Sequence, residues 1–118
     1  MSSTQTDRPG EIAAAISNLV VKLVAEYTGR GPTKSRTYIN EDLITIVLQD
    51  TLTKGEQSLV RDGKSELVLG MRLAFQQTMR PVFISGIERI TGRTVRAFLS
   101  ANHMDPDVAI ENFLLESV

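Results

Sequence analysis

Residues 37–48 read TYINEDLITIVL, and this stretch decides the fold. Two runs rich in β-branched and aromatic residues, 37–39 and 43–48, flank the polar triplet at 40–42, which is the pattern of a β-hairpin. The second run is almost entirely apolar, so we expect a central strand that is covered on both faces. The neighbouring sequence on either side supplies helices that can pack against such a strand pair.

On the N-terminal side, apolar residues recur every three or four positions from Ile12 to Tyr27. This spacing predicts a helix from Glu11 that ends near Thr28 and Gly29. Further alanines and valines widen its apolar surface beyond what one packing face needs. We interpret the extra width as a sign of oligomerisation, and expect a homodimer that forms through this helix or through a sheet edge.

On the C-terminal side, Thr53 and Glu56 have the spacing of a capping box and predict a short helix to about Asp62. Helical spacing over residues 65–90 predicts a long core helix. Pro81 falls inside it, so we expect a kink there or two abutting helices.

Residues 95–99 and 108–115 predict two more strands, joined by the turn SANHMDPD at residues 100–107. The expected fold is a single α+β domain: a four-stranded antiparallel sheet of two hairpins, packed against two long helices and one short helix in the order α-β-β-α-α-β-β. We assign residues 11–118 to this domain and residues 1–10 to a disordered leader.

Composition limits the function. The chain has 118 residues, a formal net charge of −1 and no cysteine, which excludes disulfides, Cys-ligated zinc and a thiol nucleophile. No secretory signal and no apolar run of about 20 residues is present, so we expect a cytoplasmic protein that does not span a membrane. The balanced charge gives no global basic field, which makes nucleic acid an unlikely partner.

The loop over residues 28–36, TGRGPTKSR, is the first candidate site. Flexible backbone that exposes amides, combined with three cations and no acid, is suited to a phosphate, a carboxylate or bicarbonate. The residues concerned are Gly29, Arg30, Gly31, Lys34 and Arg36. A purely structural interpretation is equally open, in which a glycine caps the helix and the cations are solvated and complement its carbonyl end. Arg36 can equally be an ion-pair partner for Glu41 or Asp42.

The second candidate is the segment 102–107, which places His103, the only histidine, near Asp105 and Asp107. A metal site or an acid–base pair is conceivable there. A catalytic metal usually needs three protein ligands, so we expect neither a metal nor another cofactor, and favour a turn capped by its Asn and Asp side chains. Residues 101–118 hold four acids and no Lys or Arg, and are therefore expected to attract the basic loop weakly.

Four segments, taken as a set, resemble the MpsC-like family, which is named after a sodium-translocating, membrane-potential-generating system. They are YTGRGPTKSRTYI at 27–39, LQDTLTKGEQSLV at 48–60, MRLAFQQTM at 71–79 and TGRTVRAFLSANHMDPDVAIENFLL at 91–115. The family's hallmark positions fall on Gly29, Arg30, Gly31, Pro32, Arg36, Thr51, Gly55, Glu56, Asn102, His103, Asp105 and Asp107. The resemblance implies an accessory or regulatory partner of a membrane system for cation flux or inorganic-carbon uptake, and implies no catalytic residues.

These observations lead to one main hypothesis. The chain is a non-enzymatic accessory or sensor protein that binds a small anion through the loop 28–36, with Asn102 and His103 contributing from the second hairpin. Ion translocation itself requires membrane spans and belongs to a membrane transporter partner.

Two alternatives remain open. The same loop can bind a nucleic-acid backbone, in which case binding weakens steeply with salt. Alternatively, His103 acts with Asp105 or Asp107 as a general acid and base in an enzyme.

Overall fold

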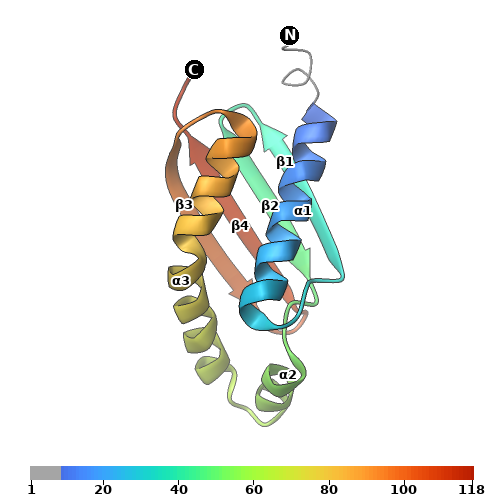
Figure 1. The fold of residues 1–118 in the computed structure, drawn as a ribbon. Coiled ribbons are helices and arrows are strands. Elements are labelled where there is room, and N and C mark those ends of the chain that lie inside the picture. Colours follow the sequence, from blue (N-terminus) through green and yellow to red (C-terminus); the bar gives the residue numbers. More distant parts are fainter. Residues whose placement is uncertain (1–8) are drawn as a thin grey trace.

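A four-stranded antiparallel sheet with helices on one face organises residues 9–118, the part of the chain that the computed structural model describes (Figure 1). The expected α+β fold and its order of elements are confirmed. The elements are α1 (Pro9–Thr28), β1 (Lys34–Asn40), β2 (Leu43–Gln49), α2 (Lys54–Arg61), α3 (Ser65–Thr91), β3 (Val95–His103) and β4 (Val108–Leu115).

The strand order across the sheet is β1-β2-β4-β3, so each hairpin contributes one central and one edge strand. All of β2 pairs antiparallel with residues 108–114 of β4, and Ile46 lies opposite Glu111. Only β3 departs from regular pairing, at an irregularity between Val95 and Ala97. The helices α2 and α3 therefore connect the central strand β2 to the edge strand β3 on the far side of β4.

The core lies between the sheet and the two long helices. Alternate residues of β2 point toward the helices, and Ile44, Ile46 and Leu48 are at most 1% exposed. Phe113 of β4 stacks on Phe98 of β3 with a centroid distance of 4.7 Å. Every second residue of the strands and every third or fourth residue of the helices thus point into the same apolar layer.

The two long helices approach each other closely at Gly86. A Cβ atom there would lie 2.4 Å from a methyl carbon of Leu19 in α1. On the side facing the sheet, α1 buries Ile16, Val20 and Val24. Ile16 and Val20 belong to the predicted apolar stripe, whereas Val24 is one of the valines assigned to the extra apolar width and Tyr27, at the end of the predicted stripe, is 37% exposed. A residue without a side chain at position 86 therefore sets the distance between the helices.

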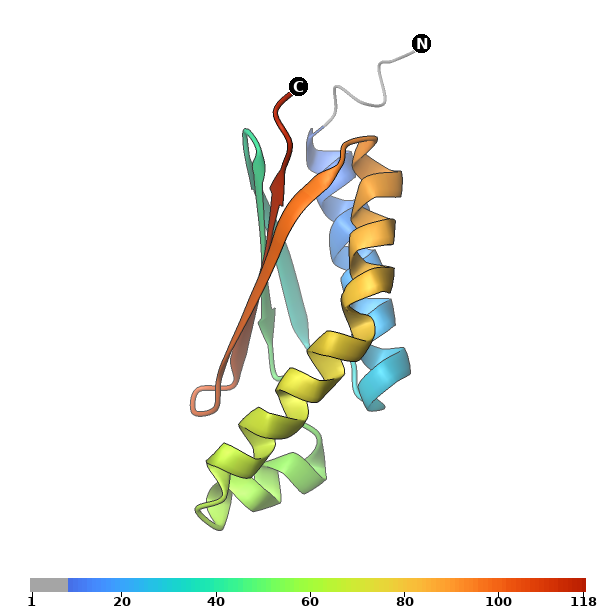
Figure 2. The same cartoon turned by 90° about the vertical axis from the view of Figure 1, so that its left-hand side faces the viewer.

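The helix α3 is continuous across Pro81 and bends partway along its length (Figure 2). Of the two sequence-based alternatives, the kink is the one observed, because Pro81 cannot donate a backbone hydrogen bond to the preceding turn. The first half of α3 and the short helix α2 project beyond one end of the sheet. The capping box of α2 is present as predicted, with Thr53 and Glu56 bonding reciprocally.

Several boundaries differ from the sequence-based expectation. Lys34, Ser35 and Arg36, expected in a loop, extend β1 because they pair with residues 47–49 of β2. The turn expected at 100–107 is shorter, since β3 continues to His103 opposite Val108. α1 begins at Pro9, and residues 1–8 of the expected leader lie outside the described residues.

The expectation that β2 is covered on both faces is wrong for the described chain. Both long helices lie on one side of the sheet, and the other side carries no element (Figure 2). Leu43 is 40% exposed there, and Val47 is only half-buried. An apolar run alone cannot show whether a strand's second face is covered by its own chain.

Candidate functional site

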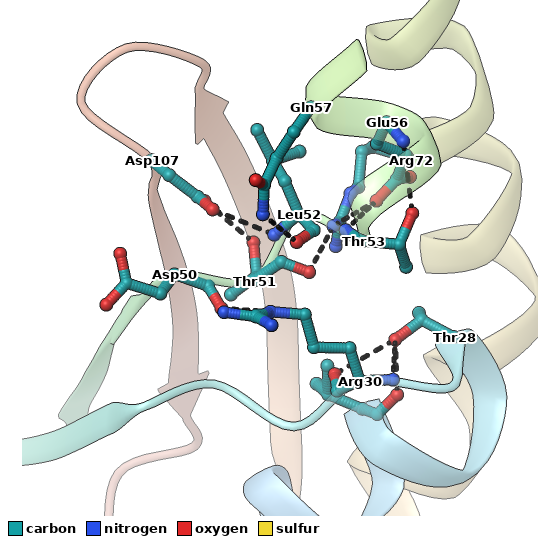
Figure 3. Close-up of polar contacts among 11 residues, drawn as sticks. Thr28, Arg30, Asp50, Thr51, Leu52, Thr53, Glu56, Gln57, Arg72 and Asp107 are labelled. Atoms are coloured by element: carbon teal, nitrogen blue, oxygen red, sulfur yellow. Dashed lines mark hydrogen bonds and ion pairs between the residues drawn. The ribbon is translucent and has the colours of Figure 1, made fainter. Parts of the chain in front are cut away.

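The connection between β2 and α2, residues 50–53, is tied to the turn between β3 and β4 (Figure 3). The carboxylate of Asp107 accepts a hydrogen bond from the Thr51 hydroxyl at 3.1 Å and one from the Leu52 backbone amide at 2.8 Å. The Asp50 amide also donates to the Asp107 carbonyl at 3.0 Å. One aspartate of the acidic turn thus holds the entry to α2.

From the other side, Arg72 of α3 reaches the same connection. Its guanidinium lies 2.7 Å from Glu56 of α2 and donates to the Thr51 carbonyl at 2.5 Å (Figure 3). Both charged side chains are almost fully buried. Because a charge inside a protein needs a partner, this ion pair locks α2 against α3 and the end of β2.

Arg30 lies beside this network. Its Nε donates to the Asp50 carbonyl at 3.0 Å, and its backbone amide approaches the Thr28 hydroxyl at 3.4 Å (Figure 3). Gly29 has a φ of 84° and its amide donates to the Ala25 carbonyl at 2.9 Å. Gly29 therefore ends α1 as a left-handed cap, which is the structural interpretation left open by the sequence.

The basic loop and the acidic turn do meet. Arg30 lines an open pocket of about 310 Å³ together with Arg61 of α2 and the carboxylates of Asp50, Asp105 and Asp107. Charges of both signs line this pocket. The arginines therefore have carboxylates of the same chain nearby, and the arrangement is better suited to holding the two segments together than to binding a free anion.

Lys34 and Arg36 lie elsewhere, on the face of β1 that points away from the helices. They line a groove of about 560 Å³ with Thr33, Tyr38 and Gln49. The described residues that line it include two cations and no carboxylate. Asp42, which the sequence offered as an ion-pair partner for Arg36, pairs instead with Arg93 at 2.5 Å, and that guanidinium lowers the pKa of Asp42.

Asn102 and His103 separate, because successive residues of a strand point to opposite faces. Asn102 lines a small cavity between α3 and the sheet, with Arg72 and Glu111. His103 is exposed on the other face, and its Nδ1 bonds to the Pro106 carbonyl at 2.8 Å. The seven residues proposed as one anion site therefore do not come together. Gly29 and Gly31 lie in the connection that follows α1, where a Cβ at Gly31 would meet Ala25 at 3.5 Å. Arg30 lies beside the polar network, Lys34 and Arg36 line the β1 groove, Asn102 lines the small cavity, and His103 is exposed on the outer face of the sheet.

Sequence reasoning missed Glu111. It lies in the middle of β4, faces the helices and is 4% exposed, and burial raises its pKa to about 7 against the pull of Ser100 and Arg72. Its Oε1 has no hydrogen-bond partner within residues 9–118. The available signal was a single acid at an inward position of the run VAIENFLL.

Comparison with known proteins gives one match. The family model described as "Na+-translocating membrane potential-generating system (MpsC)" matches residues 8–117. No curated protein and no solved structure matches significantly. Within residues 9–118, no helix combines the length and the apolar character needed to cross a bilayer. Since the family model spans almost the whole chain, this protein belongs to the MpsC family.

Proposed function

We propose that this chain is a regulatory accessory protein of a Na⁺-translocating membrane system and that it senses a small anion in the groove on β1. The groove lined by Lys34 and Arg36, with no carboxylate among its described residues, is the observation that carries the proposal. In this proposal the membrane partner moves the ion, and the chain described here catalyses no reaction.

The geometry of a strand brings the two cations together. Residues two positions apart point to the same face, so Lys34 and Arg36 lie about 7 Å from each other along β1. An arginine offers two parallel donors to an oxyanion, and a lysine adds a point charge. Thr33 and Gln49 line the same groove. The Thr33 hydroxyl donates to the Asp50 carboxylate, which leaves the Gln49 amide as the additional side-chain donor. Bicarbonate and inorganic phosphate have the size and the acceptors that such a groove accommodates.

The histidine-based enzyme hypothesis has less support. His103 bonds to a backbone carbonyl, whereas the Asp107 carboxylate is occupied by Thr51 and Leu52. A general acid–base pair needs a carboxylate that orients the imidazole or faces a substrate with it.

A thermal-shift titration with sodium bicarbonate and with phosphate, at constant ionic strength, tests the proposal. A ligand that binds only the folded state raises the melting temperature in a saturable way. We expect such a shift for the wild type and its loss in Arg36→Ala and Lys34→Ala. The matched control is Arg89→Ala, an exposed arginine on α3 outside the groove, which should keep the shift. Equal responses in all four proteins would contradict the assignment.

One observation favours nucleic acid as a second candidate. Tyr38 is 52% exposed on the same strand face as the two cations, and bases stack on exposed aromatic rings. Binding of a fluorescent single-stranded oligonucleotide that weakens steeply with salt and is lost in Tyr38→Ala would support it. Binding of bicarbonate or phosphate that changes little with added chloride would support the small-anion proposal instead.

A further inference from the structure

The face of the sheet that points away from the helices, here called the open face, is regular. Its side chains form four rows that run across β1, β2, β4 and β3. In that strand order the rows are Asn40, Leu43, Leu114 and Ala97; Tyr38, Thr45, Asn112 and Leu99; Arg36, Val47, Ile110 and Ala101; and Lys34, Gln49, Val108 and His103.

The open face is apolar at its centre, and the four rows of described residues that form it contain no acid. Val47 and Ile110 are paired at its middle, and the Thr45 hydroxyl donates to the Asn112 Oδ1 at 2.8 Å. Tyr38 and Leu99, at opposite edges of one row, are 52% and 61% exposed. The cations Lys34 and Arg36 are confined to the β1 edge. A contiguous apolar face rimmed by polar groups is typical of an interaction surface.

The width of the face indicates what covers it. The axes of β1 and β3 lie about 14 Å apart, given a strand spacing of about 4.8 Å. A single helix is about 10 Å across and leaves part of that width bare. A second sheet packs on a sheet at a distance of about 10 Å and covers it entirely.

We propose that two copies of this chain pack their open faces together about a two-fold axis that runs parallel to the strands. This operation lays β1 of one copy over β3 of the other and keeps each row over the same row. Leu43 then opposes Leu114, Val47 opposes Ile110, and Thr45 opposes Asn112. The only polar-on-apolar pair among these central strands is Gln49 over Val108, at the end of the face. A two-fold axis perpendicular to the strands would instead place Leu43 over Gln49, Thr45 over Val47 and Asn112 over Ile110, which mismatches the middle of the face as well.

The pairing places the two most exposed apolar side chains of the face on each other. Tyr38 of one copy lies over Leu99 of the second copy, twice in the dimer. The cations also avoid each other, because Arg36 opposes Ala101 and stays at the rim. A surface that is complementary to itself in this way is the requirement of a two-fold interface.

The same arrangement adds a side chain from the second copy to the β1 groove. This part of the inference rests on the proposed anion function. Lys34 and His103 share a row but lie on opposite edges of one sheet. In the dimer, His103 of the second copy lies over Lys34. Two equivalent sites then form at the rim, each with Lys34 and Arg36 from one copy and His103 from the other.

Sedimentation velocity on the full chain, over a concentration series, tests the dimer. We expect the wild type to dimerise, and Tyr38→Asp and Leu99→Lys each to raise the dissociation constant at least about a hundredfold, because each buries an unpaired charge twice. The double variant should recover most of the affinity, since the new Asp and Lys face each other only between copies. Circular dichroism checks that each variant is folded.

The control is Leu73→Lys, which alters an apolar side chain that is 58% exposed on α3, away from the open face. It should leave dimerisation unchanged. A monomeric wild type at every concentration overturns the proposal, as does a dimer that Leu73→Lys disrupts while Leu99→Lys does not. Failure of the double variant to recover affinity overturns the row pairing.

The shared anion site has its own measurement. Bicarbonate or phosphate binding, followed by the thermal shift, should weaken at least about tenfold in His103→Ala while the protein stays dimeric. Loss of binding in Arg36→Ala with no change in His103→Ala overturns the shared site but keeps the groove. Dimerisation without any anion shift overturns the proposed function and leaves the dimer standing.

Discussion

At the level of single residues, the segments DTLTKGE (50–56) and DPD (105–107) are joined in the folded protein by one polar network. Its charged and hydroxyl side chains are those of Asp107, Thr51, Glu56 and Arg72. Asp107 satisfies the hydroxyl and the amide at the start of the β2–α2 connection, and Arg72 takes the Thr51 carbonyl and the Glu56 carboxylate. Residues more than 50 positions apart therefore share one polar network. These side chains provide hydrogen bonds to buried polar groups of the chain, a role for which carboxylates, hydroxyls and a guanidinium are suited.

The buried ion pair predicts an asymmetric response to mutation. Glu56→Ala leaves the Arg72 charge uncompensated inside the protein and should cost about 3–5 kcal/mol of unfolding free energy. Replacing both partners, as Glu56→Met with Arg72→Leu, should recover much of that loss because no buried charge remains. Urea unfolding of the single variants Glu56→Met and Arg72→Leu and of the double variant measures the coupling. Strictly additive losses would show that the two side chains do not depend on each other.

Glu111 predicts a pH dependence of stability. Its folded-state pKa of about 7 lies above the ordinary value of 4.5, so the folded protein binds the proton more tightly than the unfolded chain. The stabilisation is fully present below about pH 4.5 and is lost as the pH rises through about 7, by up to about 3 kcal/mol.

Glu111→Gln removes this titration. Urea midpoints from about pH 5 to about pH 8 should fall for the wild type and fall much less for the variant, which becomes the more stable protein at the alkaline end. Glu116→Gln, a change to an exposed acid next to β4, is the matched control and should follow the wild type. Parallel curves for all three proteins would rule out the assignment to Glu111.

At the scale of elements, two glycines of α3 differ in what surrounds them. Gly70 faces open space, whereas a side chain at Gly86 would meet Leu19 of α1. The intrinsic helix propensity of the two positions is the same, so the difference in their responses reports the packing of α1 on α3.

Substitution by alanine separates the two effects. Gly70→Ala should stabilise the protein by about 0.5–1 kcal/mol through helix propensity alone. In Gly86→Ala the same gain is offset by the displacement of Leu19, and the larger Gly86→Leu should destabilise by about 1–3 kcal/mol. Thermal melts of the three variants provide the measurement. A stabilised Gly86→Leu would mean that α1 and α3 do not pack closely in solution.

At the scale of the whole molecule, the asymmetry of the two layers is the dominant feature. Helices cover one face of the sheet, and the open face presents apolar side chains and cations to its surroundings (Figure 2). The helix α2 and the first half of α3 project beyond the end of the sheet and do not cover that face. The open face and the polar network are thus separate parts of the molecule.

This separation leads to a prediction for the dimer. Glu56→Gln, which perturbs the polar network, should lower the melting temperature while leaving the sedimentation behaviour unchanged. Leu99→Lys should sediment as a monomer at concentrations where the wild type is dimeric. Its melting temperature, measured at low protein concentration where dimerisation contributes little to stability, should stay close to that of the wild type. A monomeric Glu56→Gln protein would show that the two parts are coupled.

The sequence by itself determined the fold class, the order of the elements and the capping box of α2. These features depend on local spacing: a period of between three and four for helices, a period of two for strands, and Thr53 three residues before Glu56. It also showed the family through strings that are distinctive in combination, and the match over residues 8–117 bears that out.

Only the tertiary structure decided which of the candidate residues come together. Strand alternation sends Asn102 inward and His103 outward, and the extension of β1 carries Lys34 and Arg36 away from Arg30. The partners of Arg72 and the burial of Glu111 likewise depend on elements that are distant in the sequence. The physical reason is that burial and long-range pairing are properties of the packed layers, and no local pattern encodes them.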